Sequence, residues 1–552
     1  MKKKILKKKI ELPVNRWTAL MFSTFAIFLC YIFMDILAPL KSLLETSRGW
    51  DSVAFGTYSG SSSFFNVFFF FLVFAGIIMD KKGMRFTAIL SIIVMSVGAA
   101  INWYSITEMF AGTSLESWFN NNLNYIPVFN ELDVSPFYMG MPASAKLASV
   151  GFMIFGCGIE MASITTMSGI IKRFKGKELA SAMGINTAII RLSVATCMIL
   201  SPLIANTNIL GSADVSHPAA FGLILILFAL VMFIIYFHMD KKLKLQSGEV
   251  EEKEDPFRVR DVGKILKNVG FWFVALLCVL YYSAIIPFQK YAVNMLECNL
   301  NFATLPSNSF WATGTAAIAQ YFIMMMAAAA AFSSNFCKKK VKTALTVCSA
   351  FLLAVICFMT YRQQSASAVF SVLPLLAIVI TPILGSFIDR KGKAATMLML
   401  GSILLIACHL SFAFILPLFK GRTTGGFIFT YITILTLGAS FSFVPASLWP
   451  SISKLVDKKV IGTAYALIFW IQNIGLWLFP ILIGRILTSS NTDIAEKLSL
   501  GLITSDEASI MYNYTNPLIM LACLGVAALV AVFFLKIIDR KKGIGLELPN
   551  IS

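Results

Sequence analysis

Charged residues are scarce in this sequence of 552 residues, where they make up 13% of the chain against 58% for hydrophobic ones. Soluble domains carry roughly a quarter charged residues, so the composition excludes an ordinary soluble protein. Apolar runs recur from Trp17 almost to the C-terminus, and about 20 such residues cross a membrane as a helix. Since lipid offers the backbone no hydrogen-bond partner, we predict an all-α polytopic membrane protein.

Residues and motifs for cofactor chemistry are also few. The chain has only 3 histidines, and its 10 cysteines are dispersed without a CxxC pair. A GxxxxGK[ST] phosphate loop is absent, which argues against coupling to ATP within this chain. No nucleophile and base stand together in a recognisable motif. We therefore expect no metal, no cofactor and no enzymatic activity.

Basic residues outnumber acidic ones by 46 to 28, a net charge of +18. They gather in short loops such as "DKKGMR", "KRFKGK" and "DRKGK", as the positive-inside rule predicts for cytoplasmic loops. This distribution argues against nucleic-acid binding and predicts that both termini are cytoplasmic and that the loops 107–143 and 487–513 lie outside. Neither tail carries an acidic dileucine signal, so we expect the inner (plasma) membrane of a bacterium.

The apolar runs predict fourteen membrane spans in two halves. The first half, 1–238, and the second, 269–552, flank a charged linker at 239–268. The predicted spans are 17–44, 52–79, 86–106, 144–171, 179–205, 218–238, 269–297, 309–332, 343–361, 366–388, 394–417, 426–451, 460–486 and 514–537.

An internal repeat relates the halves. "GIIMDKKGMR" (76–85) matches "GSFIDRKGKA" (385–394), and "ELASAMGINTAIIR" (178–191) matches "VIGTAYALIFWIQN" (460–473) more loosely. Pro39 precedes Gly76 by 37 residues, whereas Pro287 precedes Gly385 by 98, a surplus of 61. We interpret the surplus as a two-helix hairpin at about 303–363, inserted into a core of two six-helix bundles. Its Ala- and Met-rich helices are expected to pack outside that core. Paired halves are typical of secondary transporters.

Two opposite charges stand deep in predicted spans. Glu160 lies twelve residues before Lys172 and Arg191 thirteen after Glu178, about 18 and 20 Å from the cytoplasmic ends of neighbouring antiparallel helices. Charges at this depth are costly and face a bundle interior. Either the two side chains pair and join their helices, or they line a central site and hold a charged substrate.

Other polar residues leave more than one interpretation open. Asp35 could couple transport to protons, bind a substrate amine, or form a polar contact at the outer gate. Lys290, beside Gln289, is expected to snorkel at the outer mouth, in a helix that Pro287 kinks. Asn473 is the repeat equivalent of Arg191. The remaining substrate-binding candidates, for which core packing is the alternative, are Gln472, Asn66, Tyr282 and Trp449.

"GIIMDKKGMR" and "GSFIDRKGK" resemble the cytoplasmic turn motif of the major facilitator superfamily. The resemblance implies that superfamily's transporter fold and a tight turn in each half. The motif residues are Gly76, Asp80, Gly83 and Arg85 in the first copy and Gly385, Asp389, Arg390 and Gly392 in the second.

A narrower resemblance is carried by "FGCGIE", "FKGKELASAMGINTAIIRLS", "YYSAIIPF", "SLWPSISKLV" and "GTAYALIFWIQNIG". These stretches are similar to the major facilitator superfamily domain-containing protein 1 group of lysosomal dipeptide uniporters. The resemblance implies that Glu160 binds the amino end and Arg191 the carboxyl end of a dipeptide. Two features depart from the group: "YIFMDILAP" lacks an Asn that follows the Asp in animal relatives, and the inserted hairpin has no counterpart.

The expected function is transport of dipeptides by alternating access, as a uniporter or with protons. Transport of another zwitterionic or anionic solute, such as an amino acid or organic acid, is the alternative within the same class. A membrane sensor or scaffold that does not transport is the alternative from another class. An accessory subunit or dimer partner is not predictable from the residues.

Overall fold

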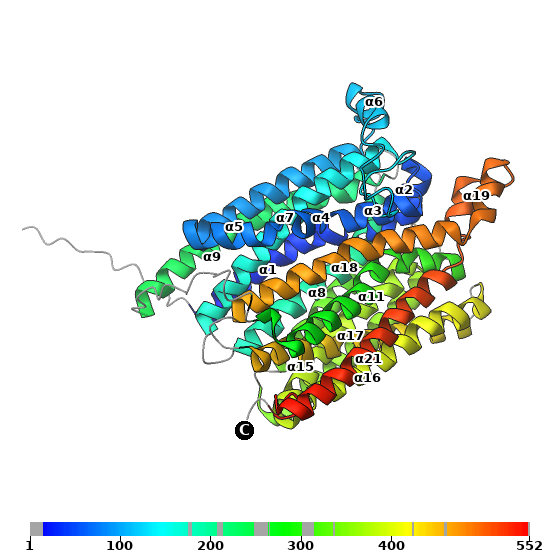
Figure 1. Cartoon of the computed structure of the whole chain (residues 1–552). Helices are drawn as coiled ribbons and strands as arrows, with labels where there is room; N and C mark the ends of the chain where they lie inside the picture. The colour runs from blue at the N-terminus through cyan, green and yellow to red at the C-terminus, as the bar shows by residue number, and fades with distance from the viewer. Residues whose placement is uncertain are drawn as a thin grey trace, which may run out of the picture.

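The computed structural model describes residues 15–174, 179–206, 214–247, 263, 265–300, 314–334, 337–421, 424–456 and 461–549. Every regular element in this part of the chain is helical, and the long helices lie side by side in one bundle (Figure 1). The first half contains α1 (Arg16–Asp35), η1 (Ala38–Leu40), α2 (Lys41–Arg48), α3 (Ser52–Ser61), α4 (Phe64–Phe68), α5 (Phe71–Ser105), α6 (Ser114–Asn121), α7 (Ala143–Phe174), α8 (Leu179–Ala205) and α9 (Ser216–Ser247).

The second half follows the same pattern of long helices. It contains α11 (Val269–Leu300), α12 (Gly314–Ser334), α13 (Lys339–Gln363), α14 (Ala366–Phe370), α15 (Val372–Lys391), α16 (Ala394–Leu410), η3 (Ser411–Ile415), η4 (Leu416–Phe419), α17 (Thr424–Leu455), α18 (Ile461–Ser489), α19 (Thr492–Ser499), α20 (Ser505–Ser509) and α21 (Thr515–Lys542).

Twelve stretches of the described chain are long and apolar enough to cross a membrane. Twelve of the fourteen predicted spans correspond to them. In α12 the described apolar stretch is shorter, Ile318–Ala331, and the predicted span 52–79 is broken. The multi-pass helical architecture is therefore confirmed, while the count of fourteen stays a prediction.

The predicted continuous span at 52–79 is interrupted twice. Its residues form α3, then α4, then the first part of α5. Between α4 and α5, Phe70 has φ +51°, a conformation that bulky side chains rarely adopt. Its ring stacks on Trp470 of α18 at 5.3 Å between centroids. The helix therefore breaks where Phe70 contacts the other half, and the continuous apolar run gave no sign of this break.

The predicted linker between the two halves differs in part from the structure. Helix α9 continues to Ser247, so it extends into the predicted linker 239–268. Residues 248–262 of that linker are outside the described part. The assignment of 1–238 and 269–552 as separate bundles stays a prediction, although the break before Val269 agrees with it.

The halves meet along two seams. In one seam α3 packs against α18, and in the other α8 packs against α14 and α15. Gly56 and Gly60 allow α3 to approach α18 closely, because neither has a Cβ. A Cβ on Gly56 would lie 2.3 Å from the Pro480 carbonyl oxygen, and a Cβ on Gly60 would lie 2.3 Å from the Trp477 carbonyl oxygen. This is the spacing by which small residues bring membrane helices together.

The hairpin α12–α13 lies on the second seam. Helix α12 packs against α8 and α15, and α13 packs against α14 and α15. On α13, the Thr360 hydroxyl is 2.6 Å from the Tyr431 hydroxyl of α17, and the Tyr361 ring lies 5.0 Å from Phe427. The hairpin therefore contacts helices of both halves.

Candidate substrate-binding site

Glu160 lies on α7 and is half-buried. Its carboxylate accepts a hydrogen bond from the side-chain amide of Asn473, with 3.4 Å between Nδ2 and Oε1. The same amide donates to the Phe469 carbonyl oxygen at 3.0 Å, which fixes its direction within α18. A carboxylate of the first half thus meets a neutral group of the second.

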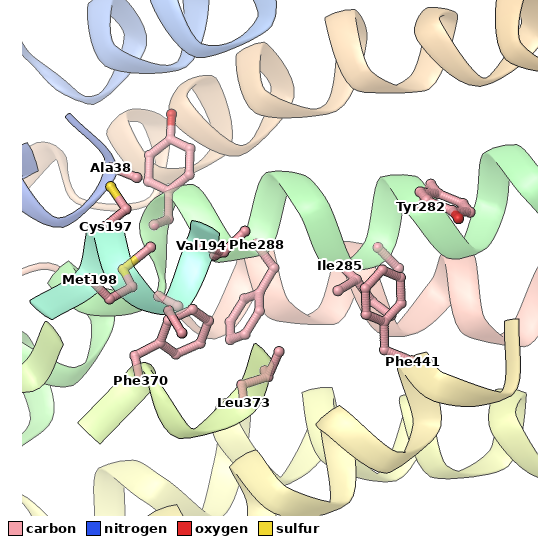
Figure 2. Close-up of a cluster of buried hydrophobic side chains, with 14 of the residues drawn as sticks. Ala38, Val194, Cys197, Met198, Tyr282, Ile285, Phe288, Phe370, Leu373 and Phe441 are labelled. Carbon is pink, nitrogen blue, oxygen red and sulfur yellow. The ribbon is translucent and has the colours of Figure 1, made fainter. Parts of the chain in front are cut away.

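Arg191 lies on α8 and is also half-buried. Its guanidinium carbon is 4.0 Å from the ring centroid of Phe441 on α17, close enough for a cation–π interaction. The guanidinium also lies close to the hydroxyl of Tyr282 on α11. Figure 2 shows Tyr282 and Phe441 side by side, with 5.8 Å between their ring centroids.

Within the described residues, neither central charge forms an ion pair with an opposite charge. The structure describes both residues, and no ion pair joins Glu160 to Arg191. The structure therefore does not contain the ion pair between Glu160 and Arg191 that the first of the two interpretations requires. Burying a charge is costly unless an opposite charge or several hydrogen bonds compensate it. A neutral amide and aromatic groups compensate only in part, so this site suits a ligand that carries both charges.

Asp35 and Lys290 form an ion pair across the halves. The Lys290 ammonium is 2.5 Å from the Asp35 carboxylate and also donates to the Met34 carbonyl oxygen at 2.7 Å. Lys290 is 5% exposed, so the prediction that it snorkels at the outer mouth is wrong: a carboxylate 255 residues away holds it inside. Asp35 contacts neither Glu160 nor Arg191 in this structure, and its geometry fits the gate interpretation.

The other predicted binding residues are distributed around the centre. Trp449 donates from Nε1 to the Tyr282 hydroxyl at 3.3 Å. Gln472 accepts from the Cys278 thiol at 3.5 Å within the second half. Asn66 is buried on α4, and its side-chain amide oxygen has no hydrogen-bond partner in the described part of the chain. Only Tyr282 and Trp449 are thereby joined to the Arg191 side of the site.

Two aromatic residues of the second half that contact or orient the central polar side chains were not predicted from the sequence. Phe441 was not a candidate, and neither was Phe469, whose carbonyl oxygen orients Asn473. One signal was available: Phe469 precedes Asn473 by four residues, which places both on one helix face. The contact of Phe441 with Arg191 joins residues 250 positions apart, and no local pattern predicts it.

The two turn motifs contain equivalent backbone breaks. Gly83 has φ +82° inside α5, and Gly392 has φ +72° after α15, the left-handed region that favours glycine. Gly76 and Gly385 lie within helices, and Arg85 and Arg390 are exposed. The side chains of the motif acids, Asp80 and Asp389, lie outside the described residues.

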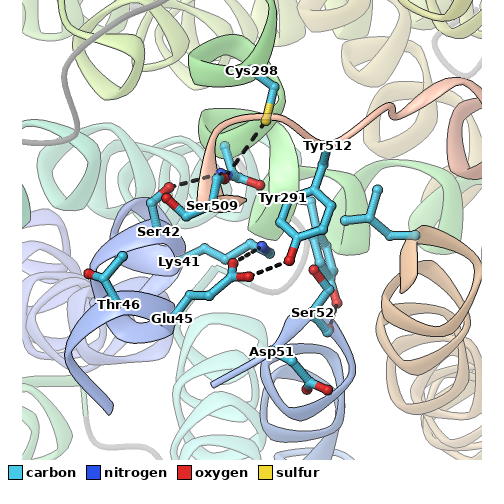
Figure 3. A network of polar contacts seen from close by, with 12 residues as sticks. Lys41, Ser42, Glu45, Thr46, Asp51, Ser52, Tyr291, Cys298, Ser509 and Tyr512 are labelled. Atoms are coloured by element: carbon cyan, nitrogen blue, oxygen red, sulfur yellow. Dashed lines mark hydrogen bonds and ion pairs between the residues drawn. The ribbon is translucent and has the colours of Figure 1, made fainter. Parts of the chain in front are cut away.

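A polar network seals one end of the bundle, which we call the closed end and which is formed by α2, the start of α3, the last turns of α11 and α20 (Figure 3). Lys41 is buried, pairs with Glu45 at 2.9 Å and lies 4.6 Å from the ring of Tyr512. Tyr512 donates in turn to Glu45, and Asn294 donates to Ser42 at 2.8 Å. The network therefore joins the two halves.

Backbone contacts strengthen this closure. The Tyr291 hydroxyl on α11 lies 2.9 Å from the Ser52 carbonyl oxygen and 3.1 Å from that of Pro480, so it touches α3 and α18 together. The Asp35–Lys290 pair adds a contact between the end of α1 and α11 directly beside Tyr291, and we include it in the closed end. At the opposite, basic end, Arg173 pairs with Asp240 within the first half and Lys536 with Glu547 within the second.

Comparisons with known proteins agree with this architecture. The model of the Major Facilitator Superfamily matches residues 134–368. The lysosomal dipeptide transporter MFSD1 of Gallus gallus is 24% identical over 347 residues, which are 62% of this chain and 62% of the relative. The Homo sapiens MFSD1 is 21% identical over 376 residues, 67% and 65% of the two chains. The match thus spans less than two thirds of these relatives' length.

Solved structures share the fold. A mutant of the nucleoside transporter NupG superposes with a TM-score of 0.59 at 12% identity, covering 94% of this chain and all of that one. A bacterial homologue of the human lysosomal transporter Spinster gives 0.56 at 11% identity, covering 95% and 98%. Together with the repeated turn and the helical bundle, these likenesses show that the chain has the fold of the major facilitator superfamily and is similar to membrane transporters of that superfamily.

Proposed function

We propose that the protein transports dipeptides, with Glu160 binding the free ammonium and Arg191 the free carboxylate. The observation that carries this proposal is the pair of opposite central charges held by neutral groups of the other half. A zwitterionic peptide supplies both missing counter-charges. Arginine suits the carboxylate because its planar guanidinium binds two oxygens at once. The relatives in Gallus gallus and Homo sapiens are named as lysosomal dipeptide transporters, which supports the same substrate class.

The contacts between the halves support transport by alternating access. The closed end is sealed by the Asp35–Lys290 pair and by the contacts of Tyr291. Because the partners of Glu160 and Arg191 belong to the second half, a bound peptide replaces or extends contacts between the halves. Binding at the centre is thereby coupled to their relative movement.

The test uses purified protein and capped peptides. Ala-Ala carries both terminal charges, its N-acetylated form keeps only the carboxylate, and its C-terminal amide keeps only the ammonium. Each cap should weaken binding to the wild type by on the order of 10- to 100-fold, since a charge-assisted contact is worth about 1.5–3 kcal/mol. In Glu160→Gln the acetyl cap should cost little further, and in Arg191→Ala the amide should cost little further.

The outcomes separate the substrate classes. Tight binding of free amino acids or organic acids with no gain for Ala-Ala would replace dipeptides as the substrate class. Equal binding of all three peptides would remove Glu160 and Arg191 from the site. Arg191→Lys is the matched control, because it keeps the charge but loses the bidentate geometry.

We further propose facilitated transport without proton coupling, since Asp35 is already occupied by Lys290. Uptake of Ala-Ala into liposomes should reach the external concentration and not exceed it when a pH gradient is imposed. Concentrative uptake would establish coupling, and its loss in Asp35→Asn would identify the carboxylate that carries the proton.

We also infer that the basic end faces the cytoplasm, because Lys81, Lys82, Arg173 and Arg390 lie near that end. A reporter fused after residue 549 should then be cytoplasmic. The bacterial plasma membrane stays a prediction, since the animal relatives are named as lysosomal.

A further inference from the structure

Five aromatic side chains of the second half form a continuous surface, which we call the aromatic wall: Tyr282, Phe441, Trp449, Tyr465 and Phe469. Centroid distances are 5.8 Å for Tyr282–Phe441, 6.4 Å for Tyr282–Trp449, 5.8 Å for Trp449–Tyr465 and 5.1 Å for Trp449–Phe469. The rings come from α11, α17 and α18. These spacings are those of packed aromatic pairs.

The wall connects the two central charges. At one end Phe441 lies 4.0 Å from the Arg191 guanidinium carbon. At the other end the Phe469 carbonyl oxygen accepts from Asn473, whose amide reaches Glu160. A ligand held between the two charges therefore lies along this wall.

The polar atoms of the wall are already engaged. Trp449 donates to the Tyr282 hydroxyl at 3.3 Å, and the Tyr465 hydroxyl donates to the Trp449 carbonyl oxygen at 3.1 Å. Phe441 and Tyr282 are buried, at 1% and 8% exposure, whereas Trp449, Tyr465 and Phe469 are half-buried. What the wall offers a ligand is apolar aromatic surface in a fixed position.

The surroundings of the two charges differ. Arg191 lies directly against rings, whereas Glu160 faces the amide of Asn473 and lies near Tyr31, whose hydroxyl is 3.2 Å from the Ser163 hydroxyl. The closest neighbour is thus an aromatic ring at the cationic end and a side-chain amide at the anionic end.

We propose that the aromatic wall is the subsite for the side chain of the C-terminal residue of the peptide, and that it selects apolar and aromatic side chains there. The inference rests on the proposed function. In a dipeptide the carboxylate and the C-terminal side chain leave the same Cα. A carboxylate bound by Arg191 therefore brings that side chain to the wall beside Arg191, where the half-buried Trp449 lies next to Tyr282. The N-terminal side chain leaves a Cα beside Glu160 and meets polar groups.

A reversed pair of peptides tests the proposal. Ala-Phe and Phe-Ala have the same composition, charge and apolar surface, so only the position of the ring differs. Wild-type protein should bind Ala-Phe tighter by on the order of tenfold, the gain expected when a ring packs against an aromatic cluster instead of polar groups. Isothermal titration in detergent gives both dissociation constants, with Ala-Ala as the reference.

Variants of the aromatic wall test whether these rings cause the preference for Ala-Phe over Phe-Ala. Trp449→Ala should bring the ratio of the two constants close to one, and Phe469→Leu, a milder change, should reduce it. Trp470→Ala is the matched control: this Trp follows Phe469 on α18, but it stacks on Phe70 and donates to the Val67 carbonyl oxygen, so the ratio should be unchanged.

Each outcome decides between the claims. Equal constants in the wild type, or tighter binding of Phe-Ala, would overturn the subsite while leaving dipeptide transport intact, provided that Ala-Ala binds. A ratio that survives both Trp449→Ala and Phe469→Leu would also overturn it. Failure of all three peptides to bind would instead refute the proposed function, and the subsite with it.

Discussion

Buried charged side chains have different partners at the closed end and at the centre of the molecule. At the closed end a buried ammonium meets a carboxylate, as in Lys290 with Asp35 and Lys41 with Glu45. At the centre Glu160 meets an amide and Arg191 meets rings. A charge with its own counter-charge is complete without a ligand, whereas a charge with neutral partners gains from one. On this difference rests our proposal that the Asp35–Lys290 pair belongs to a gate and that Glu160 and Arg191 belong to a binding site.

The largest expected effect comes from breaking the pair at the closed end. Asp35→Asn leaves the Lys290 ammonium buried without a counter-charge, and Lys290→Met does the same to Asp35. Breaking a buried pair typically costs about 3–5 kcal/mol of stability. Each single variant should therefore unfold at a clearly lower temperature in detergent, measured by intrinsic fluorescence.

The double variant sharpens this prediction. Asp35→Asn combined with Lys290→Met removes both charges together, so it should regain most of the lost stability. Additive losses in the double variant would mean that the two residues act separately and that their ion pair does not hold the gate.

The next effect concerns the seam at the closed end. Gly60→Leu places a side chain where the Trp477 carbonyl oxygen lies 2.3 Å from an ideal Cβ, and backbone cannot move aside as a flexible side chain can. We expect a penalty of about 1–3 kcal/mol on the closed state. Spin labels at Ser47 and Lys497 should then report a longer distance between α2 and α19.

A control at Gly184 separates this effect from a general one. An added Cβ at Gly184 meets nothing within 4 Å, so Gly184→Leu should leave the distance distribution unchanged. An unchanged distribution in Gly60→Leu would instead mean that α3 and α18 need no close approach for closure.

The sequence predicted what depends on local pattern. Apolar runs indicated the helices because burial in lipid depends on composition over about twenty residues. The repeat predicted the turns at Gly83 and Gly392, which share a positive φ. Depth along the helix also identified Glu160 and Arg191 as central charges, although their role stays a proposal.

The remaining errors have one physical origin. Lys290 was expected to snorkel, the span at 52–79 was expected to be continuous, and Phe441 was overlooked. Each depends on a partner in the other half: Asp35 for Lys290, Trp470 for Phe70 at the break, and Arg191 for Phe441. Contacts between distant segments leave no periodicity in the chain, so single-sequence reasoning does not reach them.

A smaller effect is expected when the central charges are neutralised. Because Glu160 has an amide as its partner, Glu160→Gln removes a desolvated charge and keeps a hydrogen-bonding group. The free energy of unfolding of the ligand-free protein should change by less than about 1 kcal/mol, or rise. A loss as large as that of Asp35→Asn would show that Glu160 is structural and would erase the contrast between centre and gate.

The smallest effect is expected from the hairpin α12–α13. Tyr321 of α12 lies against Thr196 of α8, and Thr196 follows Arg191 by five residues, about 140° around the helix. The hairpin thus contacts the helix that carries Arg191 on a different face. Replacing residues 301–363 by a short polar linker should leave the affinity for Ala-Ala within about twofold of wild type.

A milder variant keeps this prediction testable if the deletion does not fold. Thr360→Val removes the hydroxyl contact with Tyr431 that anchors α13 to α17 and should likewise leave affinity unchanged. If the folded deletion variant loses binding while Thr360→Val keeps it, then α12 positions α8. The insertion would in that case belong to the binding machinery, because the orientation of Arg191 would depend on support from the opposite face of its helix.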